Sequence, residues 1–305
     1  MSEGSAKEAA YWSAEENNAV RCGLCPHRCH VPENSTGACG VRENRVGRLI
    51  ASSYGQVSSV ALDPIEKKPL YMFHPGKRIL SIGGFGCNMK CRFCQNYEIS
   101  SEYGKIRQNA SRLSPDDVVS AALRTVPEGN VGIAYTYNEP LVGYEFVADC
   151  AVLAFEKGLY NVLVTNGCIN AEPLENLLPL VDAMNIDLKG FTDGFYKYLG
   201  GDLETVKETI ARASAVCHVE VTTLVLPGVG DPDSRADPST QGNENDIPEI
   251  AKWLASVDPG IPLHLTRFFP KYHYRDRQPT PRETILRLCE AAKKHLKYVF
   301  PGNMG

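Results

Sequence analysis

The stretch ILSIGGFGCNMKCRFC, residues 79–94, decides both the fold and the chemistry expected of this chain. Its first half is a short apolar run of the kind that forms a buried strand. Its second half places Cys87, Cys91 and Cys94 on one short loop, where three thiolates can hold three corners of a four-iron cluster and leave the fourth iron open. A structural zinc site normally closes with four ligands, so zinc is the weaker interpretation. Phe93 can shield such a cluster from water.

After this loop, short apolar runs alternate with helical patterns, which is typical of βα units around a parallel sheet. Polar motifs recur at the carboxyl end of nearly every run, and this favours a partial (β/α)6 TIM-type barrel over a doubly wound sheet. Strands are expected at residues 79–85, 131–136, 160–165, 183–188, 217–226 and 261–268, with a further candidate at 297–300.

Two helix starts are marked in the sequence. Ser114-Pro115 and Thr280-Pro281 each pair an N-cap hydroxyl with a proline at the first helical position and a carboxylate three residues after the hydroxyl. The Gly-, Pro- and Asp-rich segment 227–246 predicts a long loop at the barrel rim, where it could act as a lid.

A second group of cysteines lies in residues 21–48, a segment poor in the periodicity that predicts helices or strands. Four soft ligands can close a tetrahedral site with no open position, which argues for a structural metal. Zinc is preferred, an auxiliary iron–sulfur cluster is the alternative, and His27 and His30 are spare candidates. The four ligands are Cys22, Cys25, Cys29 and Cys39.

Composition places limits on the class of protein. The 305 residues, 43% of them hydrophobic and 22% charged, suit one sizeable globular domain, and we divide the chain into a polar segment 1–20, a Cys-rich module with its lead-in at 21–75 and a barrel at 76–305. The net charge of −4 and dispersed basic residues leave nucleic-acid binding unsupported. No apolar run is long enough to cross a membrane, so we expect a cytoplasmic protein. In a reducing compartment, clustered cysteines indicate metal ligation before disulfides.

The motif CNMKCRFC resembles the CxxxCxΦC signature of the radical S-adenosylmethionine (SAM) superfamily. RCGLCPHRC, GACGVREN, YTYNEP, TNG, IDLKG and HLTRFFP are similar to motifs of its pyruvate formate-lyase activating enzyme-like branch, and more closely to the radical SAM member of the AmmeMemoRadiSam system. This resemblance implies a [4Fe-4S] cluster on the three cysteines, SAM on the open iron, and an electron donor such as flavodoxin or ferredoxin.

The resemblance also implies a set of SAM contacts at the strand ends. Glu139 can accept from the SAM ammonium, Asp187 from ribose hydroxyls, and Lys189 can face the carboxylate. TNG is also a common turn string, a lone His264 on an apolar strand is often a core residue, and Val164 stands where many activating enzymes carry an Asp that joins a cation site. The expected contacts are Phe93, Gln95, Asn138, Glu139, Thr165, Asn166, Asp187, Lys189, His264 and Arg267.

The expected activity is therefore the reductive cleavage of SAM to methionine and a 5′-deoxyadenosyl radical, which abstracts hydrogen from a protein or another large substrate. Activation of a glycyl radical enzyme is one version. Modification of another macromolecule or metabolite is the other, and it is slightly favoured because the chain lacks the inserted ferredoxin-like module of many activases. A non-catalytic iron–sulfur electron carrier is the alternative class, but it would need none of the SAM motifs.

Overall fold

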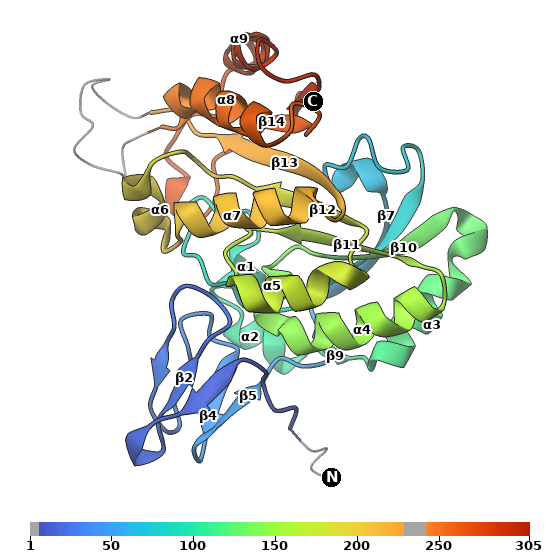
Figure 1. Ribbon diagram of the computed structural model, residues 1–305, viewed down its shortest axis with the longest axis vertical. Helices are drawn as coiled ribbons and strands as arrows, with labels where there is room; N and C mark the ends of the chain where they lie inside the picture. The colour runs from blue at the N-terminus through green and yellow to red at the C-terminus, as the bar shows by residue number, and fades with distance from the viewer. Residues whose placement is uncertain (1–5, 229–241) are drawn as a thin grey trace.

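An eight-stranded sheet forms the centre of the protein, whose structure, a computed structural model, describes residues 6–228 and 242–305 (Figure 1). The strand order is β15-β14-β13-β12-β11-β10-β8-β7. Neighbours from β8 to β15 pair in parallel, and β7 pairs antiparallel with β8. The strands are β7 (Ser59–Pro64), β8 (Arg78–Gly83), β10 (Asn130–Thr136), β11 (Tyr160–Thr165), β12 (Ala183–Asp187), β13 (His218–Val225), β14 (Leu263–Arg267) and β15 (Val299–Gly302).

This topology confirms the partial barrel. Each parallel strand lies beside the next one along the chain, and the sheet ends in two separate edges, β7 and β15. The six expected strands and the further candidate are all present, because their apolar runs are buried. The antiparallel edge strand β7 was not expected, since its alternation of small and apolar residues is short and largely half-exposed.

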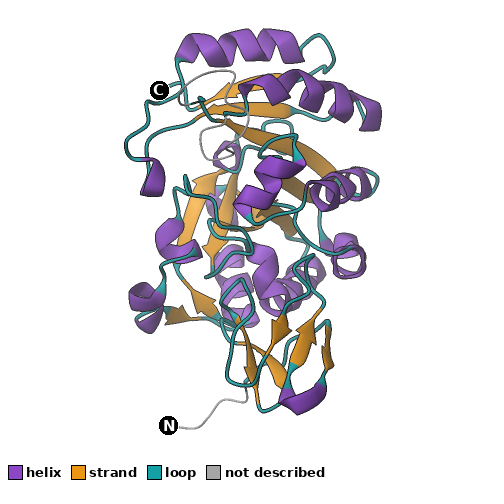
Figure 2. Ribbon diagram, turned by 90° about the vertical axis from the view of Figure 1, so that its left-hand side faces the viewer, coloured by secondary structure: helices purple, strands orange, loops and turns teal. Residues whose placement is uncertain are grey.

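Helices follow the strands and stack along the sheet, from α3 to α9, as Figure 1 shows, and Figure 2 shows the curved sheet beside them. Contacts of α4 with β11, α7 with β13 and α9 with β14 bury their apolar faces. The longer helices are α3 (Pro115–Arg124), α4 (Tyr144–Glu156), α5 (Ala171–Leu177), α6 (Asp193–Leu199), α7 (Leu203–Ser214), α8 (Ile247–Val257) and α9 (Arg282–Ala292), and two short ones are α1 (Tyr97–Ser100) and α2 (Gly104–Gln108).

One of the two expected helix starts is confirmed. The Ser114 hydroxyl accepts from the Asp117 N–H, the Asp117 carboxylate accepts from the Ser114 N–H, and Pro115 is the first helical residue. The prediction that Thr280 caps the last helix was wrong. Its buried hydroxyl donates to the Val225 carbonyl at 2.6 Å, so α9 begins at Arg282 without a side-chain cap.

The N-terminal cysteine segment forms short strands that its sequence pattern did not predict. Two small sheets stack below the barrel in Figure 1, and short loops between their strands carry most of the cysteines. Their strands are β1 (Trp12–Ala14), β2 (Val20–Cys22) and β3 (His30–Val31) in one sheet, and β4 (Arg42–Arg45) and β5 (Arg48–Ala51) in the other, while β6 (Gln56–Val57) pairs with β9 (Ser111–Arg112).

The barrel interior is closed at one end by residues 65–77. Ile65 and Leu70 pack against Ile79, Ala134 and Val162 of the central strands. Buried Glu220 also holds this segment, because the Glu220 carboxylate accepts hydrogen bonds from the backbone N–H groups of Tyr71 and Met72. The other end, where the parallel strands finish, is thereby left for a site.

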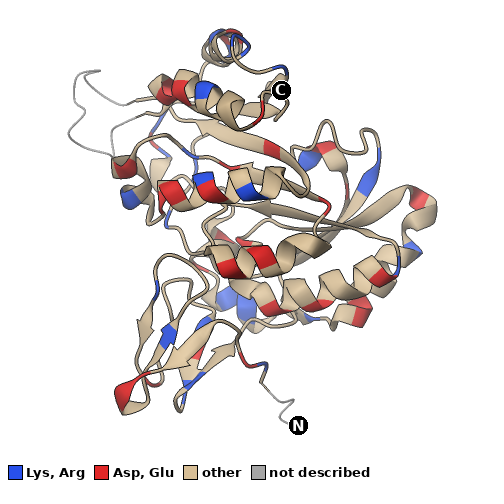
Figure 3. Cartoon of the chain, in the orientation of Figure 1, with Lys and Arg blue, Asp and Glu red and all other residues tan. Residues whose placement is uncertain are grey.

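The expected lid at 227–246 falls mostly on residues 229–241, which lie outside the described residues. Lys and Arg are interspersed with Asp and Glu along the outer helices (Figure 3), as the dispersed sequence charges indicate. Among the described residues, no helix has the length and apolar character that crossing a membrane requires.

Candidate active site

A cavity of about 380 Å³ lies at the carboxyl ends of the barrel strands, where the polar motifs converge. It collects the cluster loop after β8 and the ends of β10, β11 and β12. The expected residues that line it are Cys87, Cys91, Phe93, Cys94, Gln95, Asn138, Glu139, Thr165, Asn166, Asp187 and Lys189.

The three thiols of the cluster loop border this cavity from one side. Burial raises the pKa of Cys91 to about 11, raises that of Cys87 further, and raises that of Cys94, so burial favours the neutral thiol at each position. Among the residues that the structure describes, no group of three or more His, Cys, Asp or Glu side chains is arranged to hold a single metal ion. The three thiols of the cluster loop do line the same cavity.

Asn138 holds the backbone that leads into the cluster loop. Its side-chain oxygen accepts from the Gly84 N–H at 2.9 Å, and its amide donates to the Gly86 carbonyl at 3.1 Å. Gly86 has φ of +87°, a left-handed conformation that favours glycine. Asn138 therefore shapes the turn immediately before Cys87.

Glu139 is buried and joins the ends of two strands. Its carboxylate accepts from the Thr165 hydroxyl and the Asn166 N–H, both at 2.7 Å, and from the Leu141 N–H at 3.0 Å. Burial raises the pKa of Glu139 to about 7 although these hydrogen bonds act in the opposite direction. A positively charged group at the cavity would favour its ionised form.

Asp187 and Lys189 form an ion pair at the end of β12. Lys189 Nζ donates to Asp187 Oδ2 at 2.9 Å, and the Lys189 backbone N–H donates to the Tyr196 hydroxyl at 3.0 Å. Burial alone would lower the pKa of Lys189, but the negative charges of Asp187 and Cys91 outweigh it and hold that pKa above its usual value. The cavity thus contains a fixed cation beside the cluster loop.

Comparison with known proteins identifies this arrangement. The radical SAM superfamily matches residues 81–237, about half of the chain. The uncharacterised protein MJ0808 of Methanocaldococcus jannaschii is 40% identical over 302 residues, covering 98% of this chain and 85% of its own length. The chain belongs to the radical SAM superfamily. It is therefore an enzyme, and its family implies a [4Fe-4S] cluster and SAM.

Relatives of this radical SAM enzyme include activating enzymes. The pyruvate formate-lyase 1-activating enzyme of Escherichia coli K12 is 26% identical over 166 residues, which cover 53% of this chain and 66% of that enzyme. The crystal structure of SuiB from Streptococcus suis, bound to its precursor peptide SuiA, aligns with a TM-score of 0.52 at 12% identity over 71% of this chain and 46% of SuiB. At that identity the likeness shows the fold alone.

Two expected SAM contacts of the radical SAM enzyme, His264 and Arg267, lie outside the cavity lining. His264 points inward one layer deeper than Thr266, which does line the cavity, and its Nε2 contacts Glu220 at 2.6 Å. Residues alternate between the two faces of a strand, so Arg267 points away and donates to the Thr280 carbonyl at 2.8 Å. The family motif located the right strand but not the layer that faces the cavity.

A polar group that the sequence did not predict also lies at the cavity, which Lys68 and Tyr137 line. Lys68 Nζ donates to Asp63 Oδ2 at 2.9 Å and lies 4.3 Å from the ring centroid of Tyr137, whose hydroxyl donates to the same carboxylate oxygen at 2.6 Å. Burial would raise the pKa of Asp63, but the hydrogen bonds from Lys68 and Tyr137 outweigh it and lower that pKa. The only sequence signal for this group was the string DPIEKK, residues 63–68, which matches none of the family motifs.

Tyr137 itself has φ of +73°, a strained conformation for a tyrosine at the end of β10. Its carbonyl accepts from the Asn96 amide at 2.7 Å, just after the cluster loop. Hydrogen bonds at both ends of the residue therefore maintain the strain beside the cavity.

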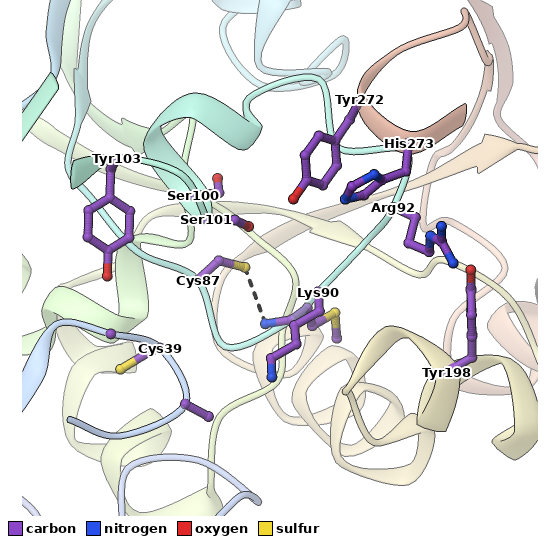
Figure 4. Close-up of a pocket in the computed structure, with 13 residues that line it drawn as sticks. Cys39, Cys87, Lys90, Arg92, Ser100, Ser101, Tyr103, Tyr198, Tyr272 and His273 are labelled. Atoms are coloured by element: carbon purple, nitrogen blue, oxygen red, sulfur yellow. Dashed lines mark hydrogen bonds between the residues drawn. The ribbon is translucent and has the colours of Figure 1, made fainter. Parts of the chain in front are cut away.

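A second hollow of about 500 Å³ lies on another side of the cluster loop (Figure 4). Its charged lining residues, Lys90 and Arg92, are both basic, and His273 and three tyrosines, Tyr103, Tyr198 and Tyr272, also line it. Cys87 of the cluster loop and Cys39 of the N-terminal module both reach it, and the Met89 N–H donates to Cys87 Sγ at 3.3 Å. This hollow therefore lies between the two groups of cysteines.

The four N-terminal cysteines also come together. Burial raises the pKa of Cys25 to about 12. They line one small cavity, whose walls are Cys22, Leu24, Cys25, His27, Cys29, Gly37, Ala38, Cys39, Arg42 and Val142. His30, the other spare candidate, instead contacts Glu15 at the surface.

Proposed function

We propose that this radical SAM enzyme holds its cluster on Cys87, Cys91 and Cys94 and binds SAM in the 380 Å³ cavity beside them. The supporting observation is that the three thiols, buried Glu139 and the ion pair at the end of β12 all line that one cavity. When bound, the reduced cluster supplies an electron that cleaves SAM into methionine and a 5′-deoxyadenosyl radical, which abstracts hydrogen from the substrate.

The protein's part is to bind and orient SAM. Glu139 accepts from the SAM ammonium, which also stabilises its ionised form against burial. Lys189 faces the SAM carboxylate, and Asp187 accepts from the ribose hydroxyls while fixing the position of Lys189. Asn138 keeps the cluster loop in register with these groups.

Phe93 excludes water from one side of the cluster. It is buried and packs in a cluster with Phe195, Leu199, Leu226, Phe268 and Tyr274. A cluster's potential depends on its solvent exposure, so this apolar wall keeps the site suited to a low-potential electron.

The substrate that we propose is a protein or another large molecule, because the relatives named as activating enzymes act on proteins and the cavity opens at the barrel end. Activation of a glycyl radical enzyme and modification of another macromolecule or metabolite are the two versions. Mixing the reduced enzyme and SAM with a glycyl radical enzyme encoded beside it distinguishes them: a glycyl radical signal in the electron paramagnetic resonance (EPR) spectrum supports activation, and its absence supports the other version.

An electron donor such as flavodoxin or ferredoxin would deliver the electron at the hollow lined by Lys90, Arg92 and His273, which reaches Cys87. Complementary charge speeds the encounter with an acidic carrier. Replacing Lys90 and Arg92 by Glu should slow cluster reduction by flavodoxin and leave reduction by dithionite unchanged. If flavodoxin reduced the variant and the wild type at the same rate, the result would contradict this entry route.

The four-cysteine site holds a second metal in this proposal. Zinc is preferred because four thiolates close a tetrahedral site, and an iron–sulfur cluster is the alternative. Metal analysis of a variant with Ala at Cys87, Cys91 and Cys94 isolates the second site. Zinc supports the preference, and iron overturns it.

EPR of the reduced, anaerobically reconstituted enzyme tests the cluster and SAM assignment. Adding SAM should change the signal of the wild-type cluster, because SAM would bind in the cavity that the three cluster cysteines line. A Cys91→Ala variant should lack this change, whereas Cys289→Ala, a buried cysteine far along the chain on α9, should keep it. A wild-type signal that ignores SAM would refute the assignment.

A further inference from the structure

The N-terminal cavity is lined by four thiol groups, which are the donors that a metal–thiolate centre uses. Its donors are four sulfur atoms, and Ala38 N–H donates to Cys29 Sγ at 3.4 Å. Buried Arg42 also lines it. Burial would lower the pKa of Arg42, but negative charge on Glu145, Cys22 and Cys39 outweighs this. The Arg42 Nε is buried and has no hydrogen-bond partner among the described residues. An N–H with no partner beside sulfur ligands fits a negatively charged metal–thiolate centre.

The same cavity touches the loop that carries the catalytic cysteines. His27 Nε2 donates to the Asn88 carbonyl at 2.7 Å, although the two residues are 61 positions apart. The Asn88 side chain also hydrogen-bonds to the Cys25 thiol. Asn88 directly follows Cys87, so one residue contacts both groups of cysteines.

The contact continues into the SAM cavity through Asn166. Its amide donates to Asn88 Oδ1 at 2.9 Å and lies 3.7 Å from Cys87 Sγ, and its backbone N–H donates to Glu139. A connected path therefore runs from Cys25 through Asn88 and Asn166 to Cys87 and Glu139. Buried polar networks of this kind hold their members in one arrangement when every group is paired.

A second, independent contact joins the two loops. A Cβ placed on Gly86 would lie 2.7 Å from the Cys39 carbonyl oxygen and against Val41, so the backbones meet with no room for a side chain. Cys39 and Cys87 also border the shared hollow of Figure 4. The N-terminal module therefore contacts the cluster loop on both sides of Cys87, at Gly86 and at Asn88.

We propose that the metal-loaded four-cysteine site positions the radical SAM cluster, with His27 and Asn88 as the residues that pass its geometry to Cys87. The proposal rests on the proposed function. A metal site that only stabilised the N-terminal module would need no contact with the cluster loop. This module contacts the loop at Gly86 and Asn88, the residues next to Cys87. Partners that orient metal ligands in this way commonly change metal affinity about 10–100-fold when removed.

His27→Ala and His30→Ala form a matched pair that tests this role. Both remove a histidine from the same module, but His27 contacts Asn88 and His30 contacts the Glu15 carboxylate at the surface. We expect His27→Ala to lose cluster iron to a chelator about tenfold faster than wild type and to show an altered EPR change on adding SAM. His30→Ala should match wild type in both. Equal behaviour of the two variants overturns the proposal.

Asn88→Ala provides a second variant, which removes the side-chain contacts with Cys25, Asn166 and the Cys168 carbonyl and keeps the carbonyl that His27 uses. It should speed the loss of cluster iron to a chelator and alter the SAM-dependent EPR change, as His27→Ala does. Wild-type values for both quantities would overturn the role of Asn88. If Asn88→Ala does not fold, the histidine pair still decides the question.

Metal analysis of the variant with Ala at Cys87, Cys91 and Cys94 completes the test. Bound zinc or bound iron in the remaining site supports a metal-held positioning site, and a metal-free protein overturns it. Failure of the proposed function is recognised separately, because the wild-type EPR signal would then ignore SAM. A normal wild-type response with indifferent His27 and Asn88 variants would refute the positioning role alone.

Discussion

Glu139 Oε1 lies 2.7 Å from the Thr165 hydroxyl, a hydrogen bond that joins the ends of β10 and β11 beside the cluster loop. The other carboxylate oxygen accepts from the Asn166 N–H at 2.7 Å. One buried side chain therefore serves both the sheet and the proposed SAM site.

Glu139→Gln should weaken both the contact between the two strand ends and the proposed binding of SAM. A Gln amide turned toward Asn166 would oppose one donor with another, and leaving a buried donor unpaired costs about 1–3 kcal/mol. We expect a lower free energy of unfolding in urea and weaker SAM binding by anaerobic calorimetry. Glu172→Gln, at an exposed position in the first turn of α5, is the control. Unchanged SAM affinity would contradict the role of Glu139.

Lys189→Met should leave the iron content unchanged and weaken SAM binding by about tenfold, because the lost charge is worth about 1.4 kcal/mol or more against a carboxylate. Lys197→Met, at an exposed position on α6, is the matched control. Equal SAM affinities of the two variants would show that Lys189 does not meet SAM.

Arg42 and Glu145 form a buried ion pair between the module and α4, with Nη1 at 2.9 Å from Oε1. Arg42→Met should cost about 3–5 kcal/mol, since it strands the buried carboxylate. Fluorescence of Trp12 in a Trp253→Phe background reports unfolding of the module. Adding Glu145→Gln should recover part of the loss, and an undiminished loss in the double variant would contradict the pairing.

Glu220 gives a pH-dependent contribution. Burial would raise its pKa, but hydrogen bonds from His218, His264 and two backbone N–H groups outweigh it and lower the pKa to about 2 from the usual 4.5. The carboxylate therefore stabilises the fold above pH 4.5, and this contribution disappears as the pH falls toward 2. At about 1.4 kcal/mol per pKa unit, Glu220→Gln should cost about 3 kcal/mol at neutral pH.

Urea unfolding between pH 7 and pH 3 measures this difference. The gap between wild type and Glu220→Gln should stay constant down to about pH 4.5 and narrow below it. A gap that is independent of pH would mean that Glu220 is not ionised in the folded protein.

The sequence predicted the strands and the cluster loop because both depend on local patterns. Buried parallel strands are apolar runs, and ligands on one loop, such as Cys87, Cys91 and Cys94, must keep their spacing in the chain. The carboxyl ends of parallel strands meet at one rim, which is why the sequence could place Glu139 and Lys189 at the cavity that they line.

The remaining features depend on contacts between distant segments. His264 was placed on the right strand but one layer too deep, because a motif does not state which layer reaches the cavity. The pair of Asp63 and Lys68 came from a lead-in with no motif, and it depends on the antiparallel pairing of β7 with β8, which brings Asp63 beside the barrel. The contact of His27 with Asn88 links segments 61 residues apart and has no local signature.

The most direct test of the central claim is the formation of 5′-deoxyadenosine. The anaerobically reconstituted enzyme is mixed with SAM and dithionite, and the product is measured by mass spectrometry. Wild type should form 5′-deoxyadenosine and methionine, and Cys94→Ala should form neither above the level without enzyme. No product from wild type with a full complement of iron, or equal product from Cys94→Ala, would contradict the account.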